Sequence, residues 1–327
     1  MISKIEKLIG NTPMIKIKYK YKGKLEYVYS KLEYYNLTGS IKDRMVLYSL
    51  NKAKERNELK DEQAIIEVTS GNTGISLASI GSFYKHPVHI FMPDWVSSER
   101  KKIIESYGAT VHLVSKDDGG FKKAIELADE LALKIKGYRL NQFNNKDNIN
   151  VHYLKTGEEI FNQLDDIGGF VSGIGTGGTL MGVGKKLKEI DVNFKLFALE
   201  PDGLQILSKG ISVGNHKIEG IGDDFIPSIV DKNLIDEIIV VNDMDSINMS
   251  KKLANDLGLG VGISSGANII AAILAKEKIS SNVVTIFADD NKKYLSTDLF
   301  NDIDIKENFI STKVELLDYE YVNKLLD

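Results

Sequence analysis

The sequence contains no cysteine, which excludes disulfide bonds, thiolate metal sites, iron–sulfur clusters and a cysteine nucleophile. It also lacks an apolar run near the roughly 20 residues that span a bilayer. Its charged N-terminus has no apolar core of the kind found in signal peptides, so we expect no membrane contact and a cytoplasmic location. The net charge of −4 is mild, so no nucleic-acid partner is expected either.

What the chain does contain is ordinary for a globular protein. Hydrophobic residues make up 43% and charged residues 27% of its 327 positions, a length that suits two domains. The histidines are few and scattered, so we interpret them as structural and predict no metal site; they are His86, His89, His112, His152 and His216.

Short apolar runs rich in β-formers alternate with longer amphipathic stretches. The predicted strands are Tyr27–Leu32, Ala64–Thr69, Val88–Met92, Thr110–Val114, Gly169–Gly173, Phe194–Glu200, Ile238–Asn242 and Val283–Asp289. The predicted helices are Asp43–Arg56, Ser97–Tyr107, Phe121–Lys136 and Thr179–Ile190. This alternation predicts α/β architecture with open, twisted and mostly parallel sheets. A polar, asparagine-rich run at Gln142–Asn150 indicates a domain boundary.

A glycine-rich loop at Gly173–Thr179 follows one predicted strand and opens a helix. Its backbone N–H groups and the positive end of the helix favour an anion such as phosphate. The same segment also fits the G-x-G-x-x-G pattern, with Glu200 where a ribose-binding acid would lie, so a nicotinamide-dependent oxidoreductase is an alternative on this evidence.

Two further segments are typical of an active site. Lys42 lies in the first turn of a predicted helix, where the helix dipole disfavours a cation and helps to lower a lysine pKa. The loop Thr69–Gly74 follows a strand and precedes a helix, which makes it a second anion site with hydroxyl and amide groups. A carboxylate is its natural guest.

Together these segments resemble the cysteine synthase and cystathionine β-synthase family, the fold-type II enzymes that use pyridoxal 5′-phosphate (PLP). The resemblance runs in order through about residues 5–300. The matching motifs are Ile9–Pro13, Thr38–Arg44, Thr69–Gly74, Gly175–Thr179, Glu219–Gly222, Val261–Gly266 and Tyr294–Thr297.

The resemblance implies a fold like that of the tryptophan synthase β-subunit, with the cofactor between two α/β domains. One domain would comprise residues 1–12 and 35–147, and the other residues 13–34 and 148–302. Residues 303–327 would form a charged C-terminal tail, either a docked helix or a partly ordered segment. Family members are commonly homodimers, so we expect a homodimer here.

The resemblance also implies residue roles. Lys42 would form the Schiff base and move the α-proton, and Asn72 would contact the cofactor's ring oxygen. The phosphate would be held by Gly175, Thr176, Gly177, Gly178 and Thr179. The substrate carboxylate and the group at Cβ would be held by Thr69, Ser70, Thr73, Gln142 and Gly222, with Ser70 also counted as catalytic.

Two aspartates depart from the family pattern. Asp290, counted back from Tyr294, takes the place of the serine that usually meets the pyridine nitrogen, so we expect a carboxylate at that nitrogen. Asp223 follows Gly222 where cysteine synthases have alanine, and we expect it to act as a catalytic base.

The expected reaction is loss of a substituent from Cβ of a small amino acid, followed by addition of a nucleophile to an aminoacrylate. Because a carboxylate assists water and repels hydrosulfide, Asp223 favours consumption of L-cysteine with release of hydrogen sulfide. The alternative is a cysteine synthase that makes L-cysteine from O-acetyl-L-serine and sulfide.

Overall fold

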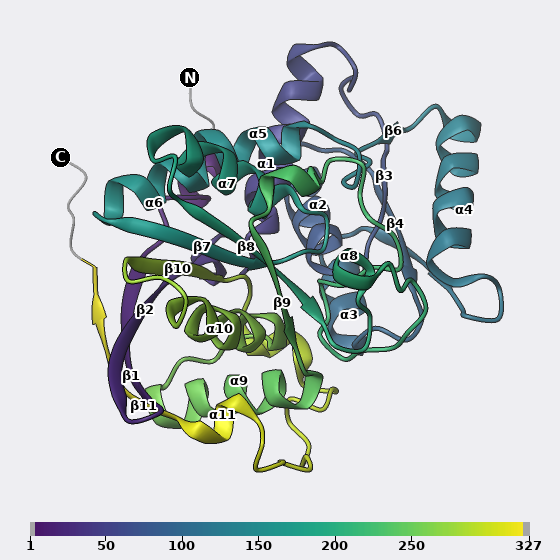
Figure 1. The fold of residues 1–327 in the computed structure, drawn as a ribbon. Coiled ribbons are helices and arrows are strands. Elements are labelled where there is room, and N and C mark those ends of the chain that lie inside the picture. Colours follow the sequence, from purple (N-terminus) through teal and green to yellow (C-terminus); the bar gives the residue numbers. More distant parts are fainter. Residues whose placement is uncertain (1–3, 323–327) are drawn as a thin grey trace.

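The computed structural model describes residues 4–322 and places two sheets in the chain (Figure 1). The larger sheet has seven strands, of which β2, β10, β7, β8 and β9 run parallel to one another. Strand β1 pairs antiparallel with both of its neighbours, β2 and β11. In spatial order its strands are β11 (Val314–Tyr321), β1 (Met14–Tyr21), β2 (Lys24–Leu32), β10 (Asn282–Phe287), β7 (Ile167–Gly173), β8 (Lys195–Pro201) and β9 (Glu237–Val241).

The smaller sheet has four parallel strands. They are β5 (Thr110–Val114), β4 (Val88–Pro93), β3 (Ile65–Val68) and β6 (Tyr138–Arg139). All strands predicted from the sequence are present, and the predicted mostly parallel α/β architecture is confirmed. The division into two domains stays a prediction.

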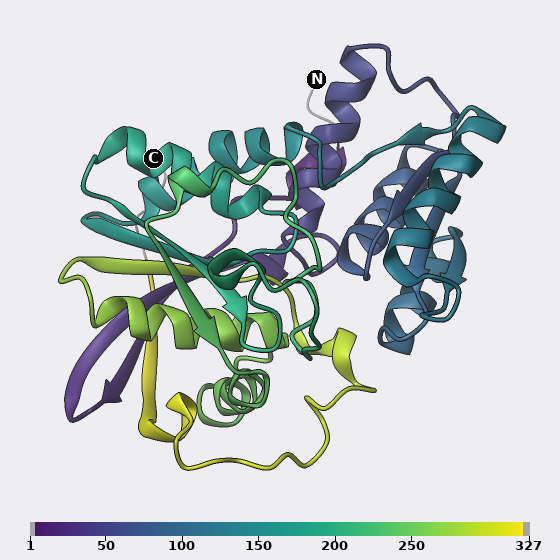
Figure 2. The ribbon, with the colours of Figure 1, turned by 45° about the vertical axis from the view of Figure 1, so that its right-hand side comes forward.

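Helices cover both faces of each sheet (Figure 2). The larger sheet packs against α9 (Asp243–Leu257) and α10 (Ile263–Lys276) on one face and against α6 (Gly157–Gln163) and α7 (Gly178–Ile190) on the other. The smaller sheet packs against α1 (Lys42–Glu55), α2 (Asn72–Phe83) and α3 (Ser98–Ser106), with α4 (Gly120–Ile135) behind it. The remaining helices are short: α5 (Asp147–Val151), α8 (Ile206–Lys209) and α11 (Ile310–Lys313).

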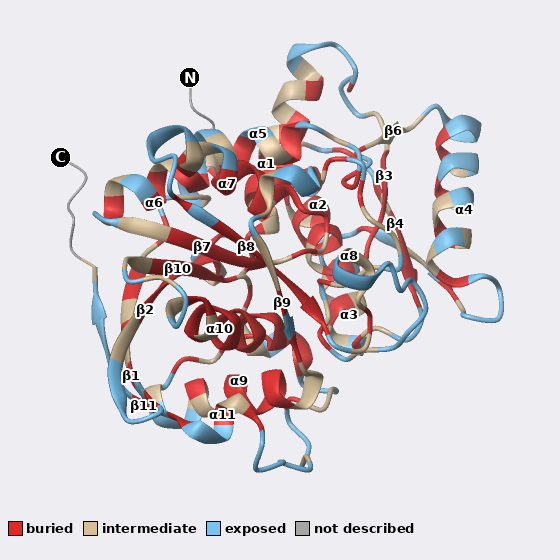
Figure 3. Ribbon diagram, viewed as in Figure 1, coloured by how far each residue is buried: buried red, intermediate tan, exposed pale blue. Residues whose placement is uncertain are grey.

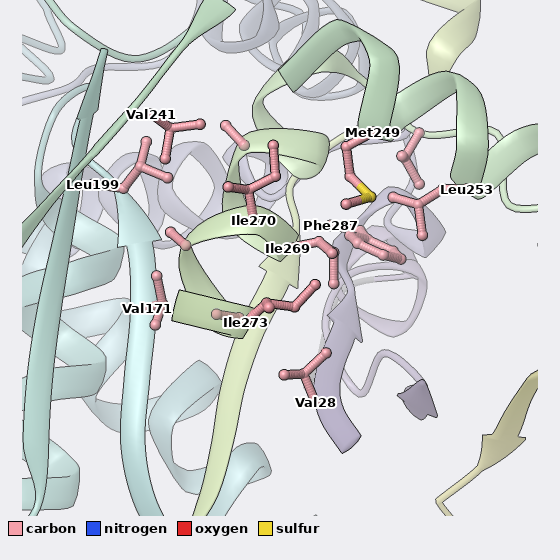
Figure 4. Close-up of a cluster of buried hydrophobic side chains, with 14 of the residues drawn as sticks. Val28, Val171, Leu199, Val241, Met249, Leu253, Ile269, Ile270, Ile273 and Phe287 are labelled. Atoms are coloured by element: carbon pink, nitrogen blue, oxygen red, sulfur yellow. The ribbon is translucent and has the colours of Figure 1, made fainter. Parts of the chain in front are cut away.

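The main core lies between the larger sheet and α10. Isoleucines of α10 belong to one buried cluster with strand residues, and Ile269 lies beside Phe287 of β10 (Figure 4). Burial follows the layers, because the central parallel strands such as β3 and β10 are buried on both faces while the outer surface of α4 is exposed (Figure 3). Such double coverage explains why these strands read as continuous apolar runs.

The C-terminal tail differs from the prediction of a docked helix or partly ordered segment. Within the described residues it forms the short helix α11 and the edge strand β11, which pairs antiparallel with β1. Only Val314 and Leu316 of β11 are buried, and the outward positions carry the charge that hid the strand pattern in the sequence. Residues 323–327 lie outside the described part.

Candidate active site

A cavity opens at the carboxyl ends of β3, β7 and β10, where ligands of open α/β sheets usually bind. Segments far apart in the sequence supply its wall. Most of the site residues predicted from the sequence line it, namely Lys42, Thr69, Ser70, Asn72, Thr73, Gln142, Gly175, Thr176, Gly177, Thr179 and Asp223. A second cavity continues outward from the first and shares Ser70 and Asp223 with it.

Lys42 is the first residue of α1, as predicted. Burial lowers the pKa of its ammonium group, against the opposing attraction of Asp289 and Asp223. Desolvation is therefore the main cause of the lowered pKa, where the sequence had suggested the helix dipole. An amine of lowered pKa is suited to Schiff-base chemistry and proton transfer.

Buried ion pairs fix α1 to the body of the protein. Arg44, in the first turn of the helix, contacts Glu33 at 2.7 Å and Glu159 at 2.6 Å. Lys31 adds a contact of 2.8 Å to Glu159. These charges are almost fully buried, so they stabilise only as a complete set, and together they hold the helix that starts with Lys42.

The glycine-rich loop between β7 and α7 forms a tight cradle. A Cβ atom on Gly175 would lie 2.3 Å from the carbonyl oxygen of Gly220, and Gly177 has a φ of +84°, so both positions need glycine. Gly178 begins α7 but does not line the cavity, because Asn148 packs directly against it. Asn148 also donates a 2.9 Å hydrogen bond to the Thr176 hydroxyl.

His152 supports the same loop, a role that its isolated position in the sequence did not indicate. Its Nε2 lies 3.3 Å from the Thr179 hydroxyl, and its Nδ1 lies 2.9 Å from that of Thr156. Burial holds the pKa of His152 well below its usual value, so the ring is neutral at physiological pH. One ring nitrogen can then accept from one threonine while the other donates.

The loop between β3 and α2 is held from the small-sheet side. Thr73 donates to Gln142 at 2.6 Å, and Gln142 donates to the Val68 carbonyl at 2.8 Å. The side chain of Arg100 packs on Gly71, where a Cβ would lie 2.2 Å from the arginine Cδ. The predicted loop is thus present, with its hydroxyl groups facing one cavity.

Arg100 is a site residue that the sequence analysis missed. It is 1% exposed, lines the cavity, lies 4.7 Å over the Tyr294 ring and forms an ion pair with Glu219. The pair joins α3 to the loop that follows α8. The sequence signal was weak, because a lone arginine in an amphipathic stretch normally indicates a solvated face.

Asp223 borders both cavities, whereas Gly222 lines the outer one. Burial raises the pKa of the Asp223 carboxyl to about 6, the neighbouring Asp224 acts in the same direction, and Lys42 opposes them. The carbonyl of Gly222 accepts a 2.6 Å hydrogen bond from His216 Nε2. A carboxyl with this pKa can exchange a proton near neutral pH.

The structure separates two adjacent aspartates. Asp290, expected at the pyridine nitrogen, does not line the cavity; its carboxylate accepts from the backbone N–H of Lys292 at 3.1 Å. Asp289 is fully buried and accepts from Asn72 at 2.8 Å. Because side chains alternate in an extended segment, only one of the two neighbours points toward Asn72, and a count along the sequence could not decide which.

Residues 5–289 match the family model described as pyridoxal-phosphate dependent enzyme. The chain belongs to this family. The nicotinamide alternative falls with it, and Glu200 shows why: its buried carboxylate is already occupied by the backbone N–H groups of Leu207 and Ser208.

Known relatives cover almost the whole chain. Cysteine synthase B of Campylobacter jejuni is 42% identical over 300 residues, which span 91% of this chain and 98% of the relative. A hydrogen sulfide-producing enzyme of Fusobacterium nucleatum is 48% identical, covers 97% of this chain with 98% of its own, and superposes with a TM-score of 0.93. A further structure of such an enzyme, an aspartate-to-asparagine variant holding an α-aminoacrylate intermediate, is 47% identical with a TM-score of 0.93 and covers 98% of this chain with 97% of its own.

The site fits PLP on its own chemistry. The glycine cradle suits the phosphate, and Lys42 suits the aldehyde. Within the described residues, Asn72 lines the cavity and its buried Oδ1 has no hydrogen-bond partner, which is the state expected of a group beside a site for a polar ligand. The protein is therefore a PLP-dependent enzyme of the cysteine synthase family that carries out β-elimination or β-replacement.

Residues 4–322 contain no group of three or more histidine, aspartate or glutamate side chains that could hold a metal ion. None of the helices in that range has the length and apolar character needed to cross a bilayer.

Proposed function

We propose that the enzyme consumes L-cysteine, releases its thiol as hydrogen sulfide and adds water at Cβ to give L-serine. The reaction balances as L-cysteine plus water giving L-serine plus hydrogen sulfide. The observation that carries the proposal is Asp223, an acid at the boundary of the inner and outer cavities whose pKa is raised to about 6.

The two candidate nucleophiles, water and hydrosulfide, differ in their need for a base. Water is a poor nucleophile at neutral pH and needs a general base within hydrogen-bond reach. A carboxylate whose pKa is raised to about 6 is ionised at pH 7 and is a stronger base than an ordinary aspartate. Hydrosulfide needs no base, and a carboxylate beside its route would repel it. Asp223 therefore suits water better than sulfide.

Other residues have supporting roles in this proposal. The bound cofactor supplies an electron sink that stabilises negative charge at Cα. Lys42 would hold it and move the α-proton, since the lowered pKa favours the neutral amine that both roles need. Ser70 and Thr73 bind the substrate carboxylate together with the N–H groups of their loop. Gln142 fixes the Thr73 hydroxyl through its 2.6 Å hydrogen bond.

Cysteine synthesis from O-acetyl-L-serine and sulfide is the second candidate. The observation that favours it is the 42% identity to a cysteine synthase over nearly the whole chain. The hydrogen sulfide-producing relative is more similar, at 48% identity. In its family an aspartate-to-asparagine change accompanies a bound α-aminoacrylate. That is the behaviour expected when a base needed for the second half-reaction is lost.

Asp223→Asn tests the proposal, with Asp224→Asn as the matched control because Asp224 is the exposed neighbour outside the inner cavity. With L-cysteine alone, the Asp223→Asn enzyme should release about one sulfide per site and then stall, with little serine formed. With O-acetyl-L-serine plus sulfide it should still form cysteine. Continued turnover of L-cysteine to serine by Asp223→Asn would show that Asp223 is not the base and would favour the synthase.

We also propose that the enzyme is a cytoplasmic homodimer built from the two predicted domains. The support is the membership of the family, whose members are commonly homodimers. Light scattering of the purified protein tests the dimer, and a monomeric mass with full activity would contradict it.

A further inference from the structure

Asp289 has no role in the chemistry described so far, yet its carboxylate contacts Asn72, which lines the cavity. Its side chain is fully buried. Its backbone forms an antiparallel bridge with Ser40, and the carbonyl of Ala288 accepts from the Ile41 N–H at 3.0 Å. The segment is therefore attached to the chain immediately before Lys42.

The carboxylate of Asp289 has two donors on one oxygen. Oδ2 accepts from Asn72 Nδ2 at 2.8 Å and from the Tyr294 hydroxyl at 2.8 Å. Burial and the nearby carboxylate raise the pKa of Tyr294 well above its usual value, so the phenol keeps its proton and must donate. Both donors are neutral, and Asp289 is thus an acceptor held in one orientation.

The fixed carboxylate of Asp289 determines the orientation of the Asn72 amide. An amide can flip by 180°, which exchanges its donor and acceptor ends. The bond to Asp289 allows only one orientation, because a carboxylate accepts and cannot donate. Within residues 4–322, Asn72 Oδ1 is buried without a hydrogen-bond partner, and the second N–H of Nδ2 remains available to an acceptor in the cavity that Asn72 lines. Asp289 itself stays outside the lining, so it acts through Asn72.

We propose that Asp289 is a positioning residue: its carboxylate fixes the orientation of the Asn72 amide, and thereby the hydrogen bond that Asn72 makes with the ring oxygen of PLP. Asp289 is also the largest attraction on the buried Lys42 ammonium, so the same carboxylate balances the charge of the lysine while it orients the amide. The proposal is independent of the nucleophile and stands whether water or sulfide is used.

The holoenzyme offers a direct measurement, because the ring-oxygen hydrogen bond sets the balance between the longer- and shorter-wavelength absorbance bands of the cofactor bound to Lys42. In Asp289→Asn, an amide carbonyl oxygen and an amide NH2 group replace the two equivalent carboxylate oxygens, so the orientation of the Asn72 amide is no longer fixed. We expect loss of the longer-wavelength band in favour of the shorter. We also expect about tenfold faster release of PLP to a trapping reagent, the effect of losing one hydrogen bond to a charged group.

Three comparisons make the test specific. Asp290→Asn should leave both bands as in the wild type. In an Asn72→Ala background, Asp289→Asn should add nothing, because the residue through which it acts is gone. Tyr294→Phe removes the second donor to Asp289 and should shift the bands in the same direction by less, which keeps the idea testable if Asp289→Asn folds poorly.

Three results would overturn the proposal. The bands could be unchanged in both Asp289→Asn and Tyr294→Phe. The Asp289→Asn shift could persist undiminished in the Asn72→Ala background, which would mean that Asp289 acts on another group. Lastly, Asp290→Asn could produce the shift in place of Asp289→Asn, which would restore the contact expected from the sequence count.

Discussion

Replacing Asp223 with asparagine should stabilise the protein while it removes the proposed base. Burial raises the pKa of Asp223 from 3.8 to about 6, so the ionised carboxylate is less favourable in the folded protein than in the unfolded chain. A shift of about two units corresponds to roughly 3 kcal/mol at neutral pH. Because the side chain borders a cavity open to water, we expect about 1–2 kcal/mol of this to be measurable.

The pH dependence follows from the sign of the shift. Below pH 3.8 the carboxyl is protonated in both states and costs nothing. As pH rises toward about 6 the unfolded chain ionises first, so wild-type stability falls, and above about 6 the full cost is present. The excess stability of Asp223→Asn should therefore grow between about pH 4 and 6 and then stay constant.

Urea unfolding of the cofactor-free proteins at several pH values checks this, since the charges are then those of the structure. Asp224→Asn serves as the comparison: Asp224 is exposed and contributes less than burial to the raised pKa of Asp223, so this change should stabilise the protein less than Asp223→Asn does. If Asp223→Asn is no more stable than the wild type at pH 8, or its advantage does not vary with pH, the carboxyl is well solvated. The reasoning that makes it a base near neutral pH would then fail.

Three further outcomes are expected. Borohydride reduction of the holoenzyme followed by peptide mapping should place the cofactor on Lys42, and a modified peptide elsewhere would refute that assignment. Thr73→Val should raise KM for the amino acid roughly five- to tenfold through one lost hydrogen bond, with PLP still bound, whereas release of PLP at unchanged KM would show that the loop was misread. Arg44→Met should lower the free energy of unfolding by about 3–5 kcal/mol because it leaves Glu33 buried without its ion-pair partner and Glu159 with Lys31 alone, and a change below 1 kcal/mol in urea unfolding would contradict this.

The sequence by itself determined the elements and the local chemistry of their connections. Doubly covered strands are continuous apolar runs, so β3, β7 and β10 could be predicted from composition alone. Anion-binding loops need glycine and hydroxyl residues at fixed places after such strands, so Gly175–Thr179 and Thr69–Gly74 were predictable too. The edge strand β11 escaped because its exposed face carries charge.

Only the tertiary structure decided which side chains of distant segments meet. Lys42 has a lowered pKa because the surrounding walls exclude water from it, and no neighbour in sequence could show this. Asp289 and Asp290 are equivalent in the sequence. In the structure, Asp289 forms a bridge with Ser40 and contacts Asn72, whereas Asp290 contacts the backbone of Lys292. Local patterns fix which groups are available, whereas burial and contact, which are properties of the packed chain, fix what each group can do.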